Sequence, residues 1–302
     1  MNTPSPEDMA AGGCPAHGDF NRLLATASLK DPEICAHPNA YYAAMRARDP
    51  VHFDEKLGAW LVSRYEDLQT VFRDPITFSM KHGYQSTYAK GFMEEFQGIL
   101  ERDGGGFFPD AIMTDPPEHT RVRKLMDNAF TVRRVKQLEP RITAVVVKMT
   151  EALADKGRCE FVQEFAQPMT IAIICEQLGL DHFDAQKIER WSRAVVQQIS
   201  HMQSRETMIE NAKQICELQN YLIARIRERE SQPREDMISD LVHAVTDDGT
   251  RLTFKETVSL VRAMLIAGNE TTATALTNLC FLLATQPDLG SCCARRPTMT
   301  AC

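Results

Sequence analysis

The sequence predicts a mainly α-helical protein with a small β-sheet near its N-terminus and one long central helix. Helix-start and helix-stop signals recur from residue 114 onward. Two short runs of β-branched and aromatic residues lie on either side of a glycine turn within residues 51–62. Residues 253–284 form one largely apolar helical pattern that would span roughly 50 Å at 1.5 Å per residue, longer than a typical globular helix.

The N-terminal part predicts one short helix followed by the sheet. Small and apolar residues over 38–48 suit a helix. The runs 51–53 and 59–62 predict two strands, and Gly58 between them predicts a hairpin turn.

A second short helix and a long irregular stretch follow. Residues 65–73 predict a helix that ends before Pro75, because proline disfavours the helical conformation in the residue that precedes it. Residues 83–113 show no regular pattern. Within them, the run of three glycines, two phenylalanines and a proline at 104–109 predicts a flexible loop, either a functional loop or a plain surface loop.

Helices dominate the rest of the chain. Asp115 can cap a helix that begins there, with Pro116 at its first position and Glu118 reaching back from the third. Glycines follow two of the later patterns and mark their ends. Further helices are expected over residues 140–156, 168–178, 184–201, 205–230 and 233–245.

The long helix has a well-defined start. Thr253 and Glu256 form a capping-box pattern directly before its apolar residues. The helix is apolar around much of its circumference, so we expect it to be a central helix. Only Arg262 and the pair Asn269-Glu270 interrupt it strongly.

Composition and charge limit the classes of function. The 302 residues are 43% hydrophobic and carry a net charge of −7, which argues against nucleic acid as the main partner. The nine cysteines contain no Cys-x-x-Cys pair or zinc spacing, so we expect no metal site of that kind and reduced thiols in a cytoplasmic protein. Residues 1–18 lack the features of a signal peptide and predict a disordered arm, and no apolar run is long enough to span a membrane.

Two side chains in the helix that follows Asp115 predict an anion site. His119 and Arg123 are four residues apart, so their side chains lie on one helix face and can donate to the same anion. The alternatives are a solvated helix face or an internal ion pair.

The central helix contains a second unusual group, Ala267-Gly268-Asn269-Glu270-Thr271-Thr272. A glycine within a helix costs about 1 kcal/mol relative to alanine, and a bulky or flat group that presses on this turn is one explanation of its presence. Glu270 and Thr271 could deliver protons, with the Thr271 hydroxyl bonded to the carbonyl of Ala267 one turn earlier. The alternative is a threonine-rich segment that makes helix contacts, with Glu270 in an ion pair.

Together these motifs resemble the cytochrome P-450 family, in particular its soluble bacterial members, over nearly the whole chain up to Pro287. The resemblance implies that His119 and Arg123 hold the propionates of a haem b. It also implies that Ala267, Gly268 and Thr271 line the cofactor and its dioxygen, and that Glu270 and Thr271 relay protons. The fold it implies is a cytochrome P-450 fold, present here in incomplete form.

The resemblance also implies a class of substrate and an electron-donating partner. Residues 83–113 correspond to the variable segment that covers the substrate, and the helices of residues 184–230 correspond to a lid. Their apolar residues imply a lipophilic small molecule, and the family's bacterial members imply a ferredoxin-type electron donor.

The resemblance ends after the central helix. The family's Glu-x-x-Arg pair and its Phe-x-x-Gly-x-x-x-Cys-x-Gly loop, whose cysteine binds the iron, do not follow residue 284. We therefore expect a partial domain over residues 19–287, an aberrant tail over 288–302, and no monooxygenation by this chain as it stands. The alternative is a non-catalytic helical binding or interaction protein, or a pseudogene product.

Overall fold

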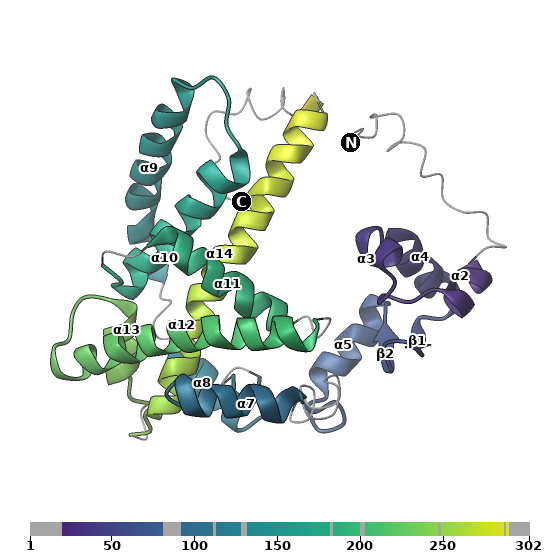
Figure 1. Cartoon of the computed structure of the whole chain (residues 1–302), viewed down its shortest axis with the longest axis horizontal. Coiled ribbons are helices and arrows are strands. Elements are labelled where there is room, and N and C mark those ends of the chain that lie inside the picture. The colour runs from purple at the N-terminus through teal and green to yellow at the C-terminus, as the bar shows by residue number, and fades with distance from the viewer. Residues whose placement is uncertain are drawn as a thin grey trace. The chain divides into compact units, whose positions relative to one another are not determined.

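The computed structural model describes residues 20–80, 92–110, 113–127, 132–181, 184–199, 203–246, 249–286 and 288–289. The chain divides into two compact units, residues 1–87 and residues 88–302, and each is described by itself (Figure 1). The predicted N-terminal arm and all but two residues of the predicted C-terminal tail lie outside the described residues. Within the described parts, no helix is both long and apolar enough to cross a lipid bilayer.

The first unit combines short helices with a two-stranded sheet. Its elements in order are α2 (Phe20–Thr26), α3 (Pro32–Ala36), α4 (Asn39–Arg48), β1 (Val51–Asp54), β2 (Ala59–Val62) and α5 (Tyr65–Arg73). The strands are antiparallel and pair Val51 with Val62, and Gly58 takes a positive φ of 69° in the turn. The predicted hairpin and both predicted helices are confirmed, whereas α2 and α3 were not predicted.

A buried carboxylate holds this first unit together. Asp54, at the end of β1, accepts hydrogen bonds from the Ser28 hydroxyl at 2.7 Å and from the backbone N–H groups of Leu29 at 3.0 Å and Leu57 at 2.9 Å. Burial opposes its charge, but these bonds lower the pKa of Asp54 below its ordinary value. The bonds connect the sheet to the chain that leaves α2.

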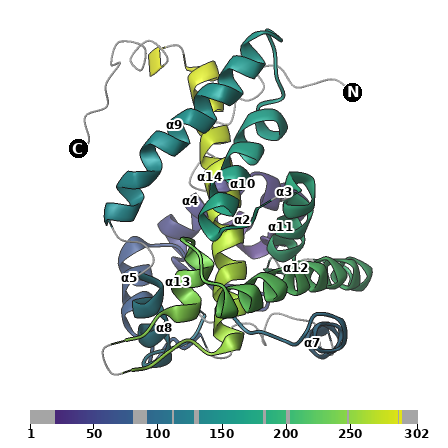
Figure 2. The same ribbon diagram turned by 90° about the vertical axis from the view of Figure 1, so that its left-hand side faces the viewer.

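The second unit is entirely helical in its named elements. They are α7 (Phe92–Asp103), α8 (Glu118–Asp127), α9 (Val132–Ala154), the π-helix η1 (Val162–Ala166), α10 (Gln167–Leu178), α11 (Ala185–Ile199), α12 (Arg205–Ser231), α13 (Met237–His243) and α14 (Phe254–Thr285). The 32-residue helix α14 runs through the middle of this unit in both views, with α10, α11 and α12 against it (Figures 1 and 2). The prediction of one long central helix is confirmed.

Capping signals placed several helix ends correctly. The Thr253 hydroxyl accepts from the N–H of Glu256, whose side chain accepts from the Thr253 N–H at 2.7 Å, so the predicted capping box begins α14. Gly179 ends α10 in a left-handed conformation. The start of α13 differs from the prediction, because the Asp236 side chain caps the N–H of Ser239 and begins the helix at Met237.

The prediction of an irregular stretch over residues 83–113 was wrong in its middle, where α7 lies. Phe96, Ile99 and Leu100 follow helical spacing and are buried against α12. The later helix predicted from residue 140 instead begins at Val132, with Pro140 inside it. In α7, packing against α12 outweighs the local loop signals. In α9, the helix continues through Pro140 although proline usually interrupts a helix.

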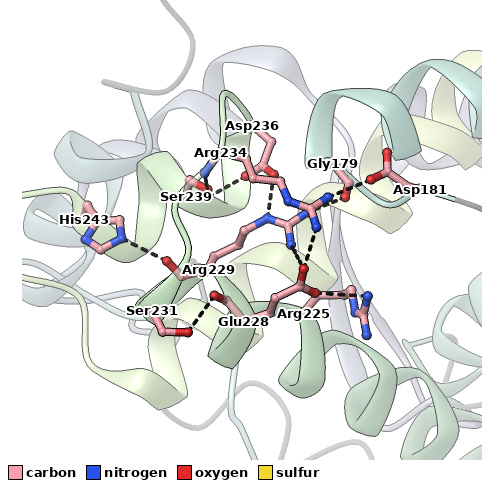
Figure 3. Close-up of polar contacts among 10 residues, drawn as sticks. All are labelled: Gly179, Asp181, Arg225, Glu228, Arg229, Ser231, Arg234, Asp236, Ser239 and His243. Atoms are coloured by element: carbon pink, nitrogen blue, oxygen red, sulfur yellow. Dashed lines mark hydrogen bonds and ion pairs between the residues drawn. The ribbon is translucent and has the colours of Figure 1, made fainter.

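A cluster of charged side chains fastens three helix ends in this unit (Figure 3). The Arg229 guanidinium, 1% exposed, donates to Asp236 at 2.7 Å and to the carbonyl of Gly179 at 2.7 Å. Arg234 donates to Asp181 at 2.7 Å and to Glu228 at 2.6 Å. These bonds join the C-terminal ends of α10 and α12 to the start of α13.

Candidate functional site

The first predicted pair lies on the first two turns of α8. His119 is half-buried, and its backbone N–H donates to the carbonyl of Asp115 at 3.0 Å. Arg123 is exposed, and its guanidinium forms an ion pair with Asp127 at 2.9 Å on the same helix. An exposed pair at this spacing contributes little to stability, so Arg123 can exchange Asp127 for another anion at small cost. The predicted alternative of an internal ion pair thus describes Arg123 in this structure.

A neighbouring arginine, which sequence reasoning did not select, attaches α8 to α14. The Arg121 guanidinium forms an ion pair with Glu256, the residue that completes the capping box of α14. Burial works against the charge of Glu256, but the bonds from Arg121 and from the Thr253 N–H lower its pKa below the ordinary value. The signal in the sequence was Glu256, an acidic residue in the first turn of α14 that is only partly exposed and has a basic partner in Arg121.

The second predicted group lies on one turn of α14, near the middle of the helix. The Thr271 hydroxyl donates to the carbonyl of Ala267 at 2.7 Å, so the predicted bond to the preceding turn is confirmed. Ala267 and Thr271 are both exposed. They offer a surface of small side chains on which a flat ligand could lie.

Asn269 faces the opposite way and holds α14 to its neighbours. It is 1% exposed, and its carbonyl oxygen accepts from the Thr170 hydroxyl of α10 at 2.7 Å. Its amide nitrogen is 3.4 Å from the hydroxyl oxygen of Ser192 of α11. Asn269, which interrupts the apolar pattern of α14, therefore forms a buried polar link among α10, α11 and α14.

Gly268 has a packing partner within the chain itself, the side chain of Ile174. A Cβ atom at this position would lie 2.8 Å from Cδ1 and 2.9 Å from Cγ1 of Ile174 in α10. The close approach of α10 to α14 is by itself a sufficient reason for a glycine at this position, and a flat cofactor against this turn stays a prediction. Gly268 and Thr272 also line an apolar pocket of about 290 Å³ between α9, α10, α13 and α14.

Glu270 is half-buried and faces α11. Burial raises the pKa of this carboxyl above its ordinary value, the negative charge of Glu189 raises it further, and Arg193 opposes both effects. Arg193 is itself paired with Glu189. A carboxyl that keeps its proton to higher pH is suited to donate one.

The structure does not bring the two predicted groups into contact. The link from α8 to α14 is at Glu256, which is fourteen residues before Glu270, or about 20 Å along the helix axis at 1.5 Å per residue. The exposed side of this helix continues beyond Thr271 with Leu279, Phe281 and Leu282, which are 51%, 54% and 41% exposed.

Sequence reasoning also passed over Arg262. This residue is 8% exposed and lies two turns before Glu270 on α14. It was noticed only as an interruption of the apolar pattern. A charged residue within an otherwise buried helix face was the available signal, because such a charge must have buried partners.

Comparison with known proteins identifies the family. Residues 101–294 match the family model described as cytochrome P-450. The vitamin D(3) 25-hydroxylase of Pseudonocardia autotrophica is 31% identical over 268 residues, which cover 87% of this chain and 62% of that protein. The 6-deoxyerythronolide B hydroxylase of Saccharopolyspora erythraea is 29% identical over 265 residues, covering 85% and 63%.

Solved structures agree with this match. The structure of the cytochrome P-450 CREJ with (4-ethylphenyl) dihydrogen phosphate aligns with a TM-score of 0.75 at 28% identity, covering 86% of this chain and 64% of that one. A mutant of P-450 EryK with erythromycin B aligns with a TM-score of 0.69 at 32% identity, covering 94% and 64%. The chain thus spans less than two thirds of the length of these relatives. By its sequence match and its fold, this chain belongs to the cytochrome P-450 family.

Proposed function

We propose that this protein is a haem-dependent monooxygenase by family, in which α8 and α14 hold a haem b beside dioxygen and a lipophilic small molecule. The observation that carries the proposal is the turn of α14 at Ala267–Thr271. There a small-residue surface, a fixed hydroxyl and a carboxyl of raised pKa occur side by side. Hydroxylases of vitamin D(3) and of 6-deoxyerythronolide B among the relatives support a lipophilic substrate.

The residues present fit the edge and one face of such a cofactor. His119 and Arg123 are both hydrogen-bond donors on the first turns of a helix, where the helix dipole adds partial positive charge, so they suit the two carboxylates of a haem b. Ala267 and Thr271 present small exposed side chains to a flat ring system. When bound, the haem iron would supply the activation of dioxygen.

Proton delivery is the task that we assign to Glu270 and Thr271. Since the Thr271 hydroxyl donates to the carbonyl of Ala267, its oxygen lone pairs are directed away from the helix axis and can accept from a ligand or water. Glu270, which retains its proton to higher pH, can pass that proton to a water molecule that is hydrogen-bonded to the Thr271 oxygen. A donor of electrons of the ferredoxin type would complete the reaction.

We further propose that the 302 residues do not catalyse monooxygenation alone, because no segment with the family's cysteine-loop pattern occurs in them. The two buried cysteines that the structure describes are poor substitutes. Burial raises the pKa of Cys175 to about 12 and that of Cys216 to about 11, so neither is poised to become a thiolate ligand.

Reconstitution of this chain with haem tests both proposals. We expect saturable haem binding that weakens about tenfold in His119→Ala or Arg123→Ala, which is the effect of losing one charge-assisted hydrogen bond. Arg141→Ala is the control, because it removes an exposed arginine paired with Glu176 elsewhere in the unit. Absence of saturable binding would favour the helical binding or interaction protein.

The reduced carbon-monoxide difference spectrum of the same sample addresses the thiolate. We expect no thiolate-type band. Such a band would show that a cysteine of this chain ligates the iron, and it would overturn the proposal that the chain is inactive alone.

A further inference from the structure

The chain that follows α7 is attached to α12 by buried side chains. The Gln219 amide nitrogen donates to the carbonyls of Gly104 at 2.9 Å and of Gly106 at 3.1 Å. Asn220 donates to the carbonyl of Asp103 at 2.8 Å. Residues 104–110, here called the 104–110 segment, are therefore held by side-chain donors that replace the regular bonding of a helix or sheet.

Arg262 of α14 completes this attachment from the other side. Its guanidinium donates to the Gln219 side-chain oxygen at 2.6 Å, to the carbonyl of Phe108 at 3.0 Å and to the Asp110 carboxylate at 3.1 Å. The arginine thus joins three parts of the unit that are far apart in the sequence: α12, the 104–110 segment and α14.

The environment explains why these residue types are needed. Gln219 is fully buried and Arg262 is 8% exposed, so each polar atom there requires a partner. A Cβ atom on Gly104 would lie 3.0 Å from the Gln219 amide nitrogen and 3.1 Å from the Cys216 sulfur, so the backbone approaches α12 closely. The planar fork of arginine reaches several acceptors at once, which a lysine ammonium cannot do in the same geometry.

We propose that Arg262 is a positioning residue that locks the 104–110 segment onto α12 and α14. The segment contributes Phe108, which is 2% exposed and packs edge-on against Phe254 at the start of α14. The lock therefore fixes both the backbone and the aromatic side chain of the segment. The family resemblance assigns residues 83–113 to the segment that covers the substrate, so any effect of the lock on substrate access rests on the proposed function.

Hydrogen–deuterium exchange on the haem-free chain tests the lock directly. In Arg262→Met we expect peptides covering residues 99–110 to exchange about tenfold faster or more, since a hydrogen bond to a charged group is lost and Gln219 loses its orientation. The amides of Gly104 and Gly106, which donate to the carbonyl of Leu100 at 2.8 and 3.2 Å, report this opening. Peptides from α10 should keep their wild-type rates.

Three further variants separate positioning from a general loss of stability. Arg262→Lys should restore only part of the protection, because it keeps the charge and loses the fork. Gln219→Glu keeps an acceptor for Arg262 but loses the donor to Gly104 and Gly106, so faster exchange should be confined to that end of the segment. Arg141→Met, which removes an exposed arginine from α9, should leave the segment unchanged.

Several results would overturn the proposal. They are wild-type exchange over residues 99–110 in a folded Arg262→Met chain, equal acceleration in α10 and in the segment, or full restoration by lysine. If Arg262→Met does not fold, the lysine and Gln219→Glu variants decide the question by the same criteria. Haem titration of the wild-type chain is a separate measurement, so failure of the proposed function and failure of the lock are distinguishable.

Discussion

Neighbouring residues on one turn of α14 have different surroundings, and this difference determines what each can do. Thr271 is exposed, and its hydroxyl is fixed by the carbonyl of Ala267. Glu270 is half-buried beside the Glu189–Arg193 pair of α11. Burial first and the charge of Glu189 second raise the pKa of its carboxyl, and Arg193 opposes them. One residue can therefore present a directed oxygen to a ligand while the next stores a proton.

The raised pKa of Glu270 predicts a pH-dependent effect on stability. An acid whose pKa is higher in the folded chain binds its proton more tightly there, so its contribution is fully present below its ordinary pKa of 4.5 and is lost as the pH rises through the raised value. We expect Glu270→Gln to gain free energy of unfolding relative to the wild type as the pH rises from about 4.5 toward neutrality. Urea unfolding at several pH values measures this difference.

The control for this experiment is Glu151→Gln, which changes an exposed glutamate on α9. Its difference from the wild type should vary little over the same range. A Glu270→Gln difference that is constant with pH, or that reverses in sign, would contradict the raised pKa.

The sequence predicted the positions of the candidate side chains better than their partners. The spacing of His119 and Arg123 and the bond from Thr271 to Ala267 depend only on helix geometry, which the sequence pattern specifies. Glu256, the partner of Arg121, and the partners Phe108 and Asp110 of Arg262 lie more than a hundred residues away along the chain. Gln219, the other partner of Arg262, is 43 residues away. No local signal specifies such contacts, although a buried charge indicates that one must exist.

At the scale of the helix, the absent side chain of Gly268 allows α14 and α10 to approach closely. Gly268 faces Ile174, and Asn269 next to it bonds to Thr170 of the same helix α10. A helical glycine usually costs about 1 kcal/mol relative to alanine, which the close packing of the two helices offsets. The glycine is thus explained by helix packing in the chain itself, before any ligand is bound.

This explanation predicts how alanine at this position behaves. In Gly268→Ala the new Cβ would lie 2.8 Å from the Ile174 Cδ1 atom, and the cost of overpacking exceeds the gain in helix propensity, so we expect a loss of about 1 kcal/mol in unfolding free energy. In an Ile174→Ala background, which lacks both the Cδ1 and the Cγ1 atom, the same change should be neutral or stabilising. Urea unfolding of the four haem-free proteins measures the coupling.

Gly98→Ala provides the matched control, because Gly98 lies in the helix α7 and a Cβ there would meet no atom within 4 Å. It should stabilise by up to about 1 kcal/mol. Additive effects of the Gly268 and Ile174 changes would show that Ile174 is not the reason for the glycine.

Helix boundaries were predicted where a chemical cap defines them and missed where only packing does. Gly179 and the Thr253–Glu256 capping box gave correct ends, since the orphan groups of a helix terminus need local partners. The helix α7 was missed for two reasons. Its apolar side chains are buried only by contact with α12, which is distant in the sequence, and the glycines that follow it dominate the local pattern.

At the scale of the molecule, the two units have separate means of cohesion. The first is organised around the buried Asp54 carboxylate, and the second around the apolar face of α14 and the charged cluster at Arg229. The bond from Arg229 to the carbonyl of Gly179 connects the ends of α12 and α10 across 50 residues of sequence. The bond from Arg229 to Asp236 adds the start of α13. Breaking it should therefore affect the whole second unit and not only one loop.

Gly179 gives the most direct way to test this cluster (Figure 3). It has a positive φ of 70°, and a Cβ atom there would lie 2.2 Å from the Asp236 carboxylate oxygen that accepts from Arg229. Gly179→Ala would displace Asp236 and leave the buried guanidinium without its main partner, so we expect a loss of roughly 3 kcal/mol or more in unfolding free energy. Gly157→Ala is the control, because its φ of 66° imposes the same backbone strain while no atom lies within 4 Å, and it should cost only about 1 kcal/mol. Equal losses in the two variants, measured by urea unfolding, would mean that backbone strain alone is responsible and that the cluster does not stabilise the unit.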